Sequence, residues 1–323
     1  MRDLRRTLAG IVLSAPLFGA GPGCVEPHQP PSCPTTHDDM FALDTSDSSL
    51  TSLIAECEQQ ASCEPLCLEL DKRTYGDDGT AIRVCELVTT EGNTEQLHVT
   101  AGFLCGGRRP GNFRQGIAPA TCNAIAAYLA RQADLEAASV RAFADLYADL
   151  VELGAPPTMR RAAIRAAADE VRHATASAAL ARRFGATIRP RQVRAAPRRD
   201  LHALVLDNAA EGCVRETYGA AVAGYQARTA SDPIVRRALY RIARDEAKHA
   251  LLAWKIQRWA APRVGDRTAI LAAAASARAE LTAEAAVTQP ELHHVLGVPA
   301  PAAATAMLRE LDARVWSPLA WRS

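Results

Sequence analysis

The chain has 323 residues, of which 48% are hydrophobic and only 5% aromatic, so it can bury a large core. The shortage of aromatic residues argues against a β-sandwich and favours closely packed helices. Lys and Arg number 37 against 36 Asp and Glu, and this balance gives no electrostatic basis for binding nucleic acid. No apolar run reaches the roughly 18 residues that a membrane-spanning helix needs.

The first 23 residues have the pattern of an export signal. Three arginines within the first six residues come before an apolar stretch, residues 8–20, and small residues follow. Cys24 stands where a bacterial lipoprotein carries its lipid. We therefore expect export to the periplasm or to the outer membrane, with membrane attachment through a lipidated Cys24, and secretion of a free protein is the alternative. The paired arginines also leave open a twin-arginine signal.

A flexible tether is expected over residues 24–48, which are rich in Pro, Thr, Asp and Ser. Residues 49–117 are expected to form a cysteine-rich module, in which the segments 81–90 and 96–104 predict a β-hairpin around a Glu-Gly-Asn turn. In an oxidising compartment its cysteines would form disulfides, and a zinc site is the alternative. These cysteines are Cys57, Cys63, Cys67, Cys85 and Cys105, together with Cys122 just after the module. Cys213 stands apart from them and is expected to stay free.

From residue 118 onward the sequence predicts a mainly α-helical fold. Short loops join the first two helical segments and the last two, so each pair should be antiparallel. An arginine-rich segment, residues 182–199, connects the pairs and is expected to be a solvated crossover loop. This is the connectivity of a ferritin-like four-helix bundle, expected over residues 118–262, with C-terminal helices in residues 263–323. The four periodic segments are residues 119–152, 157–184, 199–229 and 231–260.

One motif occurs on both the second and the fourth predicted helix. Glu170-x-x-His173 and Glu246-x-x-His249 each lie within the pattern Asp-Glu-x-basic-His-Ala, 13 residues from a preceding proline to the glutamate. Residues i and i+3 share a helix face, so each motif offers a carboxylate and an imidazole to one side, which is half of a dinuclear metal site. Structural ion pairs are the alternative, although buried charges in alanine-rich helices are costly without a metal or a partner.

A complete site of this kind needs one more glutamate from each of the other two helices. Glu136 is the candidate on the first helix, since Glu152 stands at the helix end. The third helix offers Glu211 and Glu216, which lie about 140° apart around an ideal helix and can both face one site only across a π-bulge. Glu216 lies at the better height among small residues, so we predict Glu216 as the ligand and keep Glu211 as an outer or alternative ligand.

Two aspartates accompany the motif glutamates. Asp169 and Asp245 each come directly before one of them and can orient the histidines from outside the metal ligands. Surface ion pairs with Arg172 and Lys248 are the alternative role for these aspartates.

The pattern resembles the di-iron carboxylate ligands of the ferritin-like superfamily, with rubrerythrin-like spacing. Residues 135–143, 211–217 and the sequence Cys-Gly-Gly-Arg-Arg-Pro at 105–110 are similar to exported ferritin-like domain proteins of myxobacterial type. The resemblance covers residues 105–259 and implies a bundle that holds two iron ions, or manganese and iron. It implies an oxidoreductase acting on O₂, peroxide or Fe(II). The alternative is a non-catalytic metal-binding or structural lipoprotein with the same fold. The implied ligands are Glu136, Glu170, His173, Glu216, Glu246 and His249, with Glu211 as the alternative.

Overall fold

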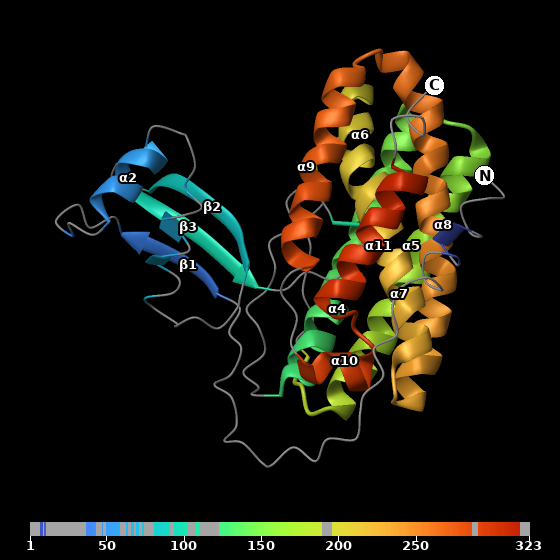
Figure 1. Ribbon diagram of the computed structural model, residues 1–323. Coiled ribbons are helices and arrows are strands. Elements are labelled where there is room, and N and C mark those ends of the chain that lie inside the picture. The colour runs from blue at the N-terminus through green and yellow to red at the C-terminus, as the bar shows by residue number, and fades with distance from the viewer. Residues whose placement is uncertain are drawn as a thin grey trace. The chain divides into compact units, whose positions relative to one another are not determined.

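The computed structural model describes residues 123–188, 196–285 and 290–316 without a break. Before residue 123 it describes residues 37–42, 51–58, 81–90 and 94–102, together with the single residues 7, 8, 10, 47, 50, 63, 66, 67, 69, 70, 73, 108 and 109. The chain divides into two compact units (Figure 1). One is Pro27–Leu104, and the other is Cys105–Ser323 together with Met1–Glu26.

The larger unit is a bundle of helices (Figure 1). Its first hairpin consists of α4 (Ala124–Glu152) and α5 (Pro157–Arg183). Three consecutive helices follow without a break: α6 (Leu201–Asp207), the π-helix η1 (Asn208–Glu216) and α7 (Thr217–Thr229). Helix α8 (Pro233–Val264) packs beside them. The C-terminal helices are α9 (Arg267–Ala285), α10 (Pro290–Leu296) and α11 (Pro301–Arg314). The prediction of a mainly helical chain is therefore confirmed.

Side-chain caps set the helix ends. The side-chain oxygen of Asn123 accepts hydrogen bonds from the backbone N–H groups of residues 125 and 126, so α4 begins at Ala124 rather than near residue 119. Asp232 caps α8 in the same way, and Pro233 occupies the first helical position. Gly265 ends α8 with a left-handed φ of 72°, a few residues beyond the helix end expected near residue 260.

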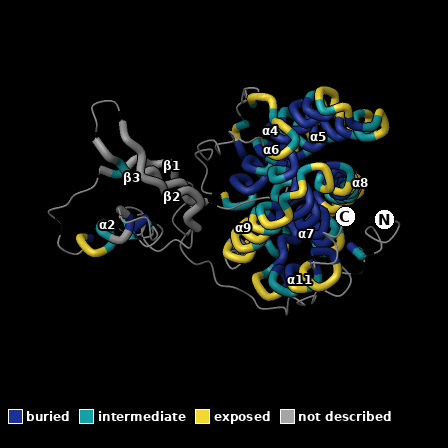
Figure 2. Tube along the Cα trace, turned by 90° about the horizontal axis from the view of Figure 1, so that it is seen from above, coloured by how far each residue is buried: buried dark blue, intermediate teal, exposed yellow. Residues whose placement is uncertain are grey.

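Two apolar layers enclose the middle of the bundle, where the helices carry polar residues. The first layer joins the start of α4 to the end of α5 and the start of α8, and its large members are Tyr128, Leu129, Leu180, Val235 and Leu296. The second joins the opposite ends of these helices, and its large members are Phe143, Leu146, Leu150, Leu204 and Ile256. Figure 2 shows that buried residues occupy the facing sides of the helices and exposed residues the outside. Polar residues between the layers are thus kept from water.

A third cluster of apolar residues lies between η1 and α7 on one side and the C-terminal helices on the other. Tyr225, Met307 and Trp316 are buried in it, and Leu8 from the N-terminal segment also belongs to it. The indole N–H of Trp316 donates a hydrogen bond of 3.0 Å to the carbonyl oxygen of Cys213, which fixes α11 against η1. Among the described helices, none combines the length and the apolar character required to cross a membrane.

The two arginines that end the crossover both contact helix α4, and Arg199 is largely covered there. Arg199 Nε lies 2.7 Å from Asp149 Oδ2 on α4, and Arg198 Nη1 lies 3.4 Å from Asp149 Oδ1. Because Asp149 is buried, it needs these cationic partners. The expectation of a solvated loop is therefore wrong for Arg199, whereas Arg198 is exposed as expected, and residues 189–195 lie outside the described part of the chain.

The smaller unit contains a three-stranded antiparallel sheet in the order β1-β3-β2. Its strands are β1 (His37–Ala42), β2 (Ala81–Thr90) and β3 (Thr94–Gly102), and helix α2 spans Thr51–Glu58. β2 and β3 pair from Ala81 opposite Gly102 to Thr90 opposite Thr94. Strand β1 pairs along the other edge of β3, so the prediction of a flexible tether over residues 24–48 is wrong for His37–Ala42.

Two disulfides join described cysteines of the smaller unit. Cys57 pairs with Cys63, and Cys67 pairs with Cys85 on β2. Cys63 and Cys67, whose Cys-x-x-x-Cys spacing is the nearest approach to a zinc motif, thus belong to different disulfides and cannot form the zinc alternative. Cys105 and Cys122 lie outside the described residues.

Alkylation of the unreduced protein should divide the cysteines into two groups. The four disulfide cysteines should resist iodoacetamide even after denaturation. Cys213 is free and buried in the larger unit, and burial raises the pKa of its thiol, so it should react only after unfolding. Peptide mass spectrometry would locate the modified residues. Alkylation of Cys67 or Cys85 without a reductant would contradict the disulfide assignment.

Candidate metal centre

The two Glu-x-x-His motifs meet in the middle of the bundle. Glu170 and His173 lie on α5, Glu246 and His249 lie on α8, and all four side chains are buried. The i, i+3 spacing places the carboxylate and the imidazole of each motif on the same face of its helix. The two faces oppose each other, with the imidazole centroids 5.9 Å apart.

Each motif glutamate contacts both histidines. Glu170 Oε1 lies 3.1 Å from His249 Nδ1, and Glu170 Oε2 lies 3.5 Å from His173 Nδ1. Glu246 Oε1 lies 3.2 Å from His173 Nδ1 and 3.6 Å from His249 Nδ1. The two carboxylates therefore occupy the space between the imidazoles, which is the position from which a carboxylate can bridge two metal ions.

The other helices each supply one glutamate to this cluster. Glu136 from the middle of α4 places Oε2 3.7 Å from His173 Nδ1. Glu216, the last residue of η1, places Oε2 3.9 Å from His249 Nδ1. Both are buried, whereas Glu152 is exposed at the end of α4. The structure thus brings together the six residues that the sequence analysis put first.

Glu211, kept as an outer or alternative ligand, lies outside the cluster and contacts arginines instead. Its carboxylate accepts hydrogen bonds from Arg109, at 3.1 Å from the backbone N–H and 2.6 Å from Nη2, and Arg215 Nε lies 3.5 Å away. Burial by itself raises the pKa of Glu211, but the charges of Arg109 and Arg215 outweigh burial and lower the pKa. Glu211 is thus an ionised partner of these arginines.

The aspartates that precede the motif glutamates reach across to the opposite helix. Asp169 Oδ2 lies 3.4 Å from Nε2 of His249, and Asp245 Oδ2 lies 3.5 Å from Nε2 of His173. In both histidines Nδ1 faces the glutamates and Nε2 faces an aspartate. Carboxylates in this position fix the ring orientation and the tautomer of a metal-ligating histidine. The aspartates also pair with Arg172 and Lys248, so both roles considered from the sequence are present.

The pKa shifts in the cluster result from several carboxyl groups lying close together and away from solvent. Burial, reinforced by the charge of neighbouring carboxylates, raises the pKa of Glu136 and Glu216. Burial alone would lower the pKa of both histidines, but the surrounding carboxylates outweigh it and raise the pKa. Four carboxyl groups in such a space need protons, imidazolium groups or a metal ion to balance their charge.

The cluster leaves many buried polar atoms without a hydrogen-bond partner. Buried polar groups are almost always hydrogen-bonded, so a set of orphaned ligand atoms pointing at one another indicates a place for a cation. The atoms without a partner are both carboxylate oxygens of Glu170 and Glu216, Oε2 of Glu246, both ring nitrogens of His173 and Nδ1 of His249. The buried Glu and His groups could hold a metal ion.

No protein-family model, no curated protein and no solved structure matches the chain.

Sequence reasoning missed two residues that support the ligands. The side-chain amide of Gln132, one turn before Glu136, donates a hydrogen bond of 2.9 Å to Glu136 Oε1. The ring of Phe143 packs against the imidazole of His249, with centroids 4.9 Å apart. The i−4 spacing of Gln132 was the available signal, whereas nothing in the local sequence connects Phe143 to α8.

A buried arginine holds the π-helix that carries Glu216. Arg108 forms an ion pair with Asp207, lies 3.3 Å from Asn208 Oδ1, and accepts a 2.7 Å hydrogen bond at its carbonyl oxygen from Ser139. Gly212 leaves room for this side chain, because a Cβ there would lie 2.9 Å from Arg108 Nη1. The Cys-Gly-Gly-Arg-Arg-Pro sequence therefore supplies a clamp for η1.

Substituting Arg108 by Ala should destabilise the bundle. Loss of one partner of a buried ion pair costs about 3–5 kcal/mol, and we expect about 3 kcal/mol because Asp207 also pairs with Arg199. Urea unfolding followed by circular dichroism would measure this change in the free energy of unfolding. Arg161→Ala removes an exposed arginine from α5 and should change it by less than about 0.5 kcal/mol. Equal stability of the two variants would contradict the clamp.

Proposed function

We propose that this chain is a ferritin-like di-iron protein, with manganese and iron as the alternative metal pair, and an oxidoreductase that acts on O₂, peroxide or Fe(II). One observation carries the proposal. Two Glu-x-x-His motifs, one from each helical hairpin, and one glutamate from each remaining helix form a single buried cluster. This ligand set is that of ferritin-like dinuclear carboxylate bundles.

The connectivity of the helices supports the same fold. The short connections α4–α5 and α7–α8 join antiparallel partners, and the long segment between α5 and α6 joins the two hairpins. The π-helix η1 ends at Glu216, and π-helical turns are frequent at functional sites.

Two irons held here would exchange electrons with O₂ or peroxide. The residues of the chain prepare the site for that chemistry. Glu170 and Glu246 stand where each can bind both metals, and Asp169 and Asp245 keep Nδ1 of the histidines directed at the glutamates. The apolar layers on both sides exclude bulk water, which strengthens the attraction between carboxylates and metal ions.

Turnover separates this proposal from a non-catalytic, structural role for the site. The full-length protein would be loaded anaerobically with Fe(II), and its iron content and visible absorption would be followed on mixing with O₂. We expect two irons per chain, a new absorption band, and repeated consumption of O₂ or peroxide when a reductant is supplied. Bound metal without consumption of either oxidant would favour the structural alternative.

We also propose that the protein is exported. Three observations support export: the arginine-rich start, the apolar residues 8–20, and the disulfides of the smaller unit, which an oxidising compartment permits. The mature protein would begin near Cys24, attach to a membrane through a lipid on that residue, and use a small oxidant or Fe(II) as its partner.

Mass spectrometry of the protein from its native host should find the first 23 residues removed and a lipid on Cys24. An unmodified Cys24 at the new N-terminus would remove only the lipidation. An intact Met1, with Leu8 retained in the core beside α11, would contradict export.

A further inference from the structure

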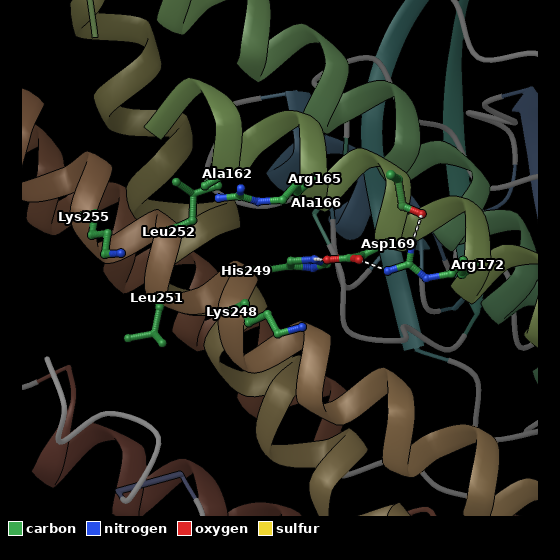
Figure 3. Close-up of a pocket in the computed structure, with 11 residues that line it drawn as sticks. Ala162, Arg165, Ala166, Asp169, Arg172, Lys248, His249, Leu251, Leu252 and Lys255 are labelled. Atoms are coloured by element: carbon green, nitrogen blue, oxygen red, sulfur yellow. Dashed lines mark hydrogen bonds and ion pairs between the residues drawn. The ribbon is translucent and has the colours of Figure 1, made fainter. Parts of the chain in front are cut away.

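A cavity of about 540 Å³ opens to the solvent beside the metal centre, between α5 and α8 (Figure 3). Its lining is partly apolar and partly cationic. Ala162, Ala166 and Leu252 line an apolar part, and four cationic side chains, Arg165, Arg172, Lys248 and Lys255, stand around it. Cavities of this volume accommodate small organic molecules.

The cavity has more positive than negative charge. Arg172 pairs with Asp169, and Lys248 pairs with Asp245. Arg165 and Lys255 have no ion-pair partner among the described residues, and Asp169 is the one acid in the lining. Two cations beside an apolar wall are thus available to a ligand that carries negative charge.

The cavity touches the metal centre through His249. His249 lines the cavity, and its Nε2 faces Asp169 at 3.4 Å (Figure 3). Its Nδ1 faces Glu170 at 3.1 Å on the inner side. One imidazole therefore separates a ligand in the cavity from the carboxylate cluster. A molecule bound there lies next to the site at which electrons would be exchanged.

We propose that this cavity binds a small organic carboxylate, with the carboxylate against Arg165 and Lys255 and an apolar body about the size of a benzene ring against Ala162, Ala166 and Leu252. The apolar wall favours an organic anion over inorganic phosphate, which has no apolar part to bury. The role of this ligand as a substrate rests on the proposed oxidoreductase function, whereas its binding does not.

The test uses 4-fluorobenzoate as the probe and the full-length protein as purified. Isothermal titration calorimetry should detect its binding and no binding of the neutral 4-fluorobenzamide at the same concentration. The double variant Arg165→Gln, Lys255→Gln should weaken 4-fluorobenzoate binding at least tenfold. The control variant Arg161→Gln, Arg241→Gln removes the same charge from exposed positions of α5 and α8 outside the cavity, and should change the affinity less than twofold.

Location is tested separately from affinity. In protein loaded with Mn(II), the ¹⁹F signal of 4-fluorobenzoate should broaden strongly, and the Arg165→Gln, Lys255→Gln variant should remove that broadening. Equal binding of the benzamide, an equal response of both double variants, or binding of inorganic phosphate without 4-fluorobenzoate would overturn the proposal. Binding that depends on Arg165 and Lys255 in a protein without O₂ or peroxide turnover would uphold the carboxylate site and contradict the proposed function.

Discussion

Replacing Glu170 or Glu246 by Ala should abolish metal binding at both positions of the centre. Each carboxylate lies between the two histidines, so under the proposed function its removal would take a ligand from both metal positions. We expect the affinity for Mn(II) or Fe(II) to fall by more than about 100-fold, because substituting a residue that only hydrogen-bonds to a metal ligand already costs about 10- to 100-fold. Calorimetric titration and metal analysis of the purified variants would measure the loss.

Two further measurements show that this loss comes from the ligand itself. Glu152→Ala removes an exposed glutamate from α4 and should leave the metal content unchanged. The metal-free Glu170→Ala protein should remain folded, because both histidines keep other carboxylates within ion-pair distance, His173 that of Glu246 at 3.2 Å and His249 that of Asp169 at 3.4 Å. Circular dichroism of the metal-free variant would check this, and loss of its helical signal would show that the lost metal binding reflects unfolding.

Local spacing was enough to predict the two motifs. An α-helix fixes residues i and i+3 on one face, and the repeated pattern around Glu170 and Glu246 placed the two faces at matching heights. The helix ends near residues 152, 183 and 233 followed from Gly, Pro and Asp signals that act within one turn. Such features need no knowledge of distant contacts.

The features that escaped prediction depend on distant residues. Arg109 lies 102 residues before Glu211, and only the folded chain brings the two together. The anchoring of Arg199 by Asp149 and the pairing of β1 with β3 are of the same kind. The sequence also left the disulfide partners open, because several pairings of the same cysteines satisfy the spacing.

The two glutamates of η1 offer the sharpest comparison, because they differ in partners but not in type. Glu216→Gln should weaken metal binding at least tenfold and change the stability of the metal-free protein little, since neither carboxylate oxygen of Glu216 has a hydrogen-bond partner there. Glu211→Gln should leave metal binding within about twofold and lower the free energy of unfolding by about 2–3 kcal/mol, because it removes the buried carboxylate charge that Arg109 and Arg215 share, although Arg215 keeps its ion pair with Glu280.

The stability loss in Glu211→Gln should depend on pH in a defined direction. The arginines lower the pKa of Glu211 below its ordinary value of 4.5, so its contribution to stability is complete above that pH and is lost as the pH falls through the lower folded-state pKa. Urea unfolding should therefore show a full difference between parent and variant at pH 7 and a shrinking one below about pH 4.5. Loss of metal binding in Glu211→Gln, with Glu216→Gln unaffected, would reverse the assignment on η1. A difference that stayed constant into acid would show that Glu211 does not act through its charge.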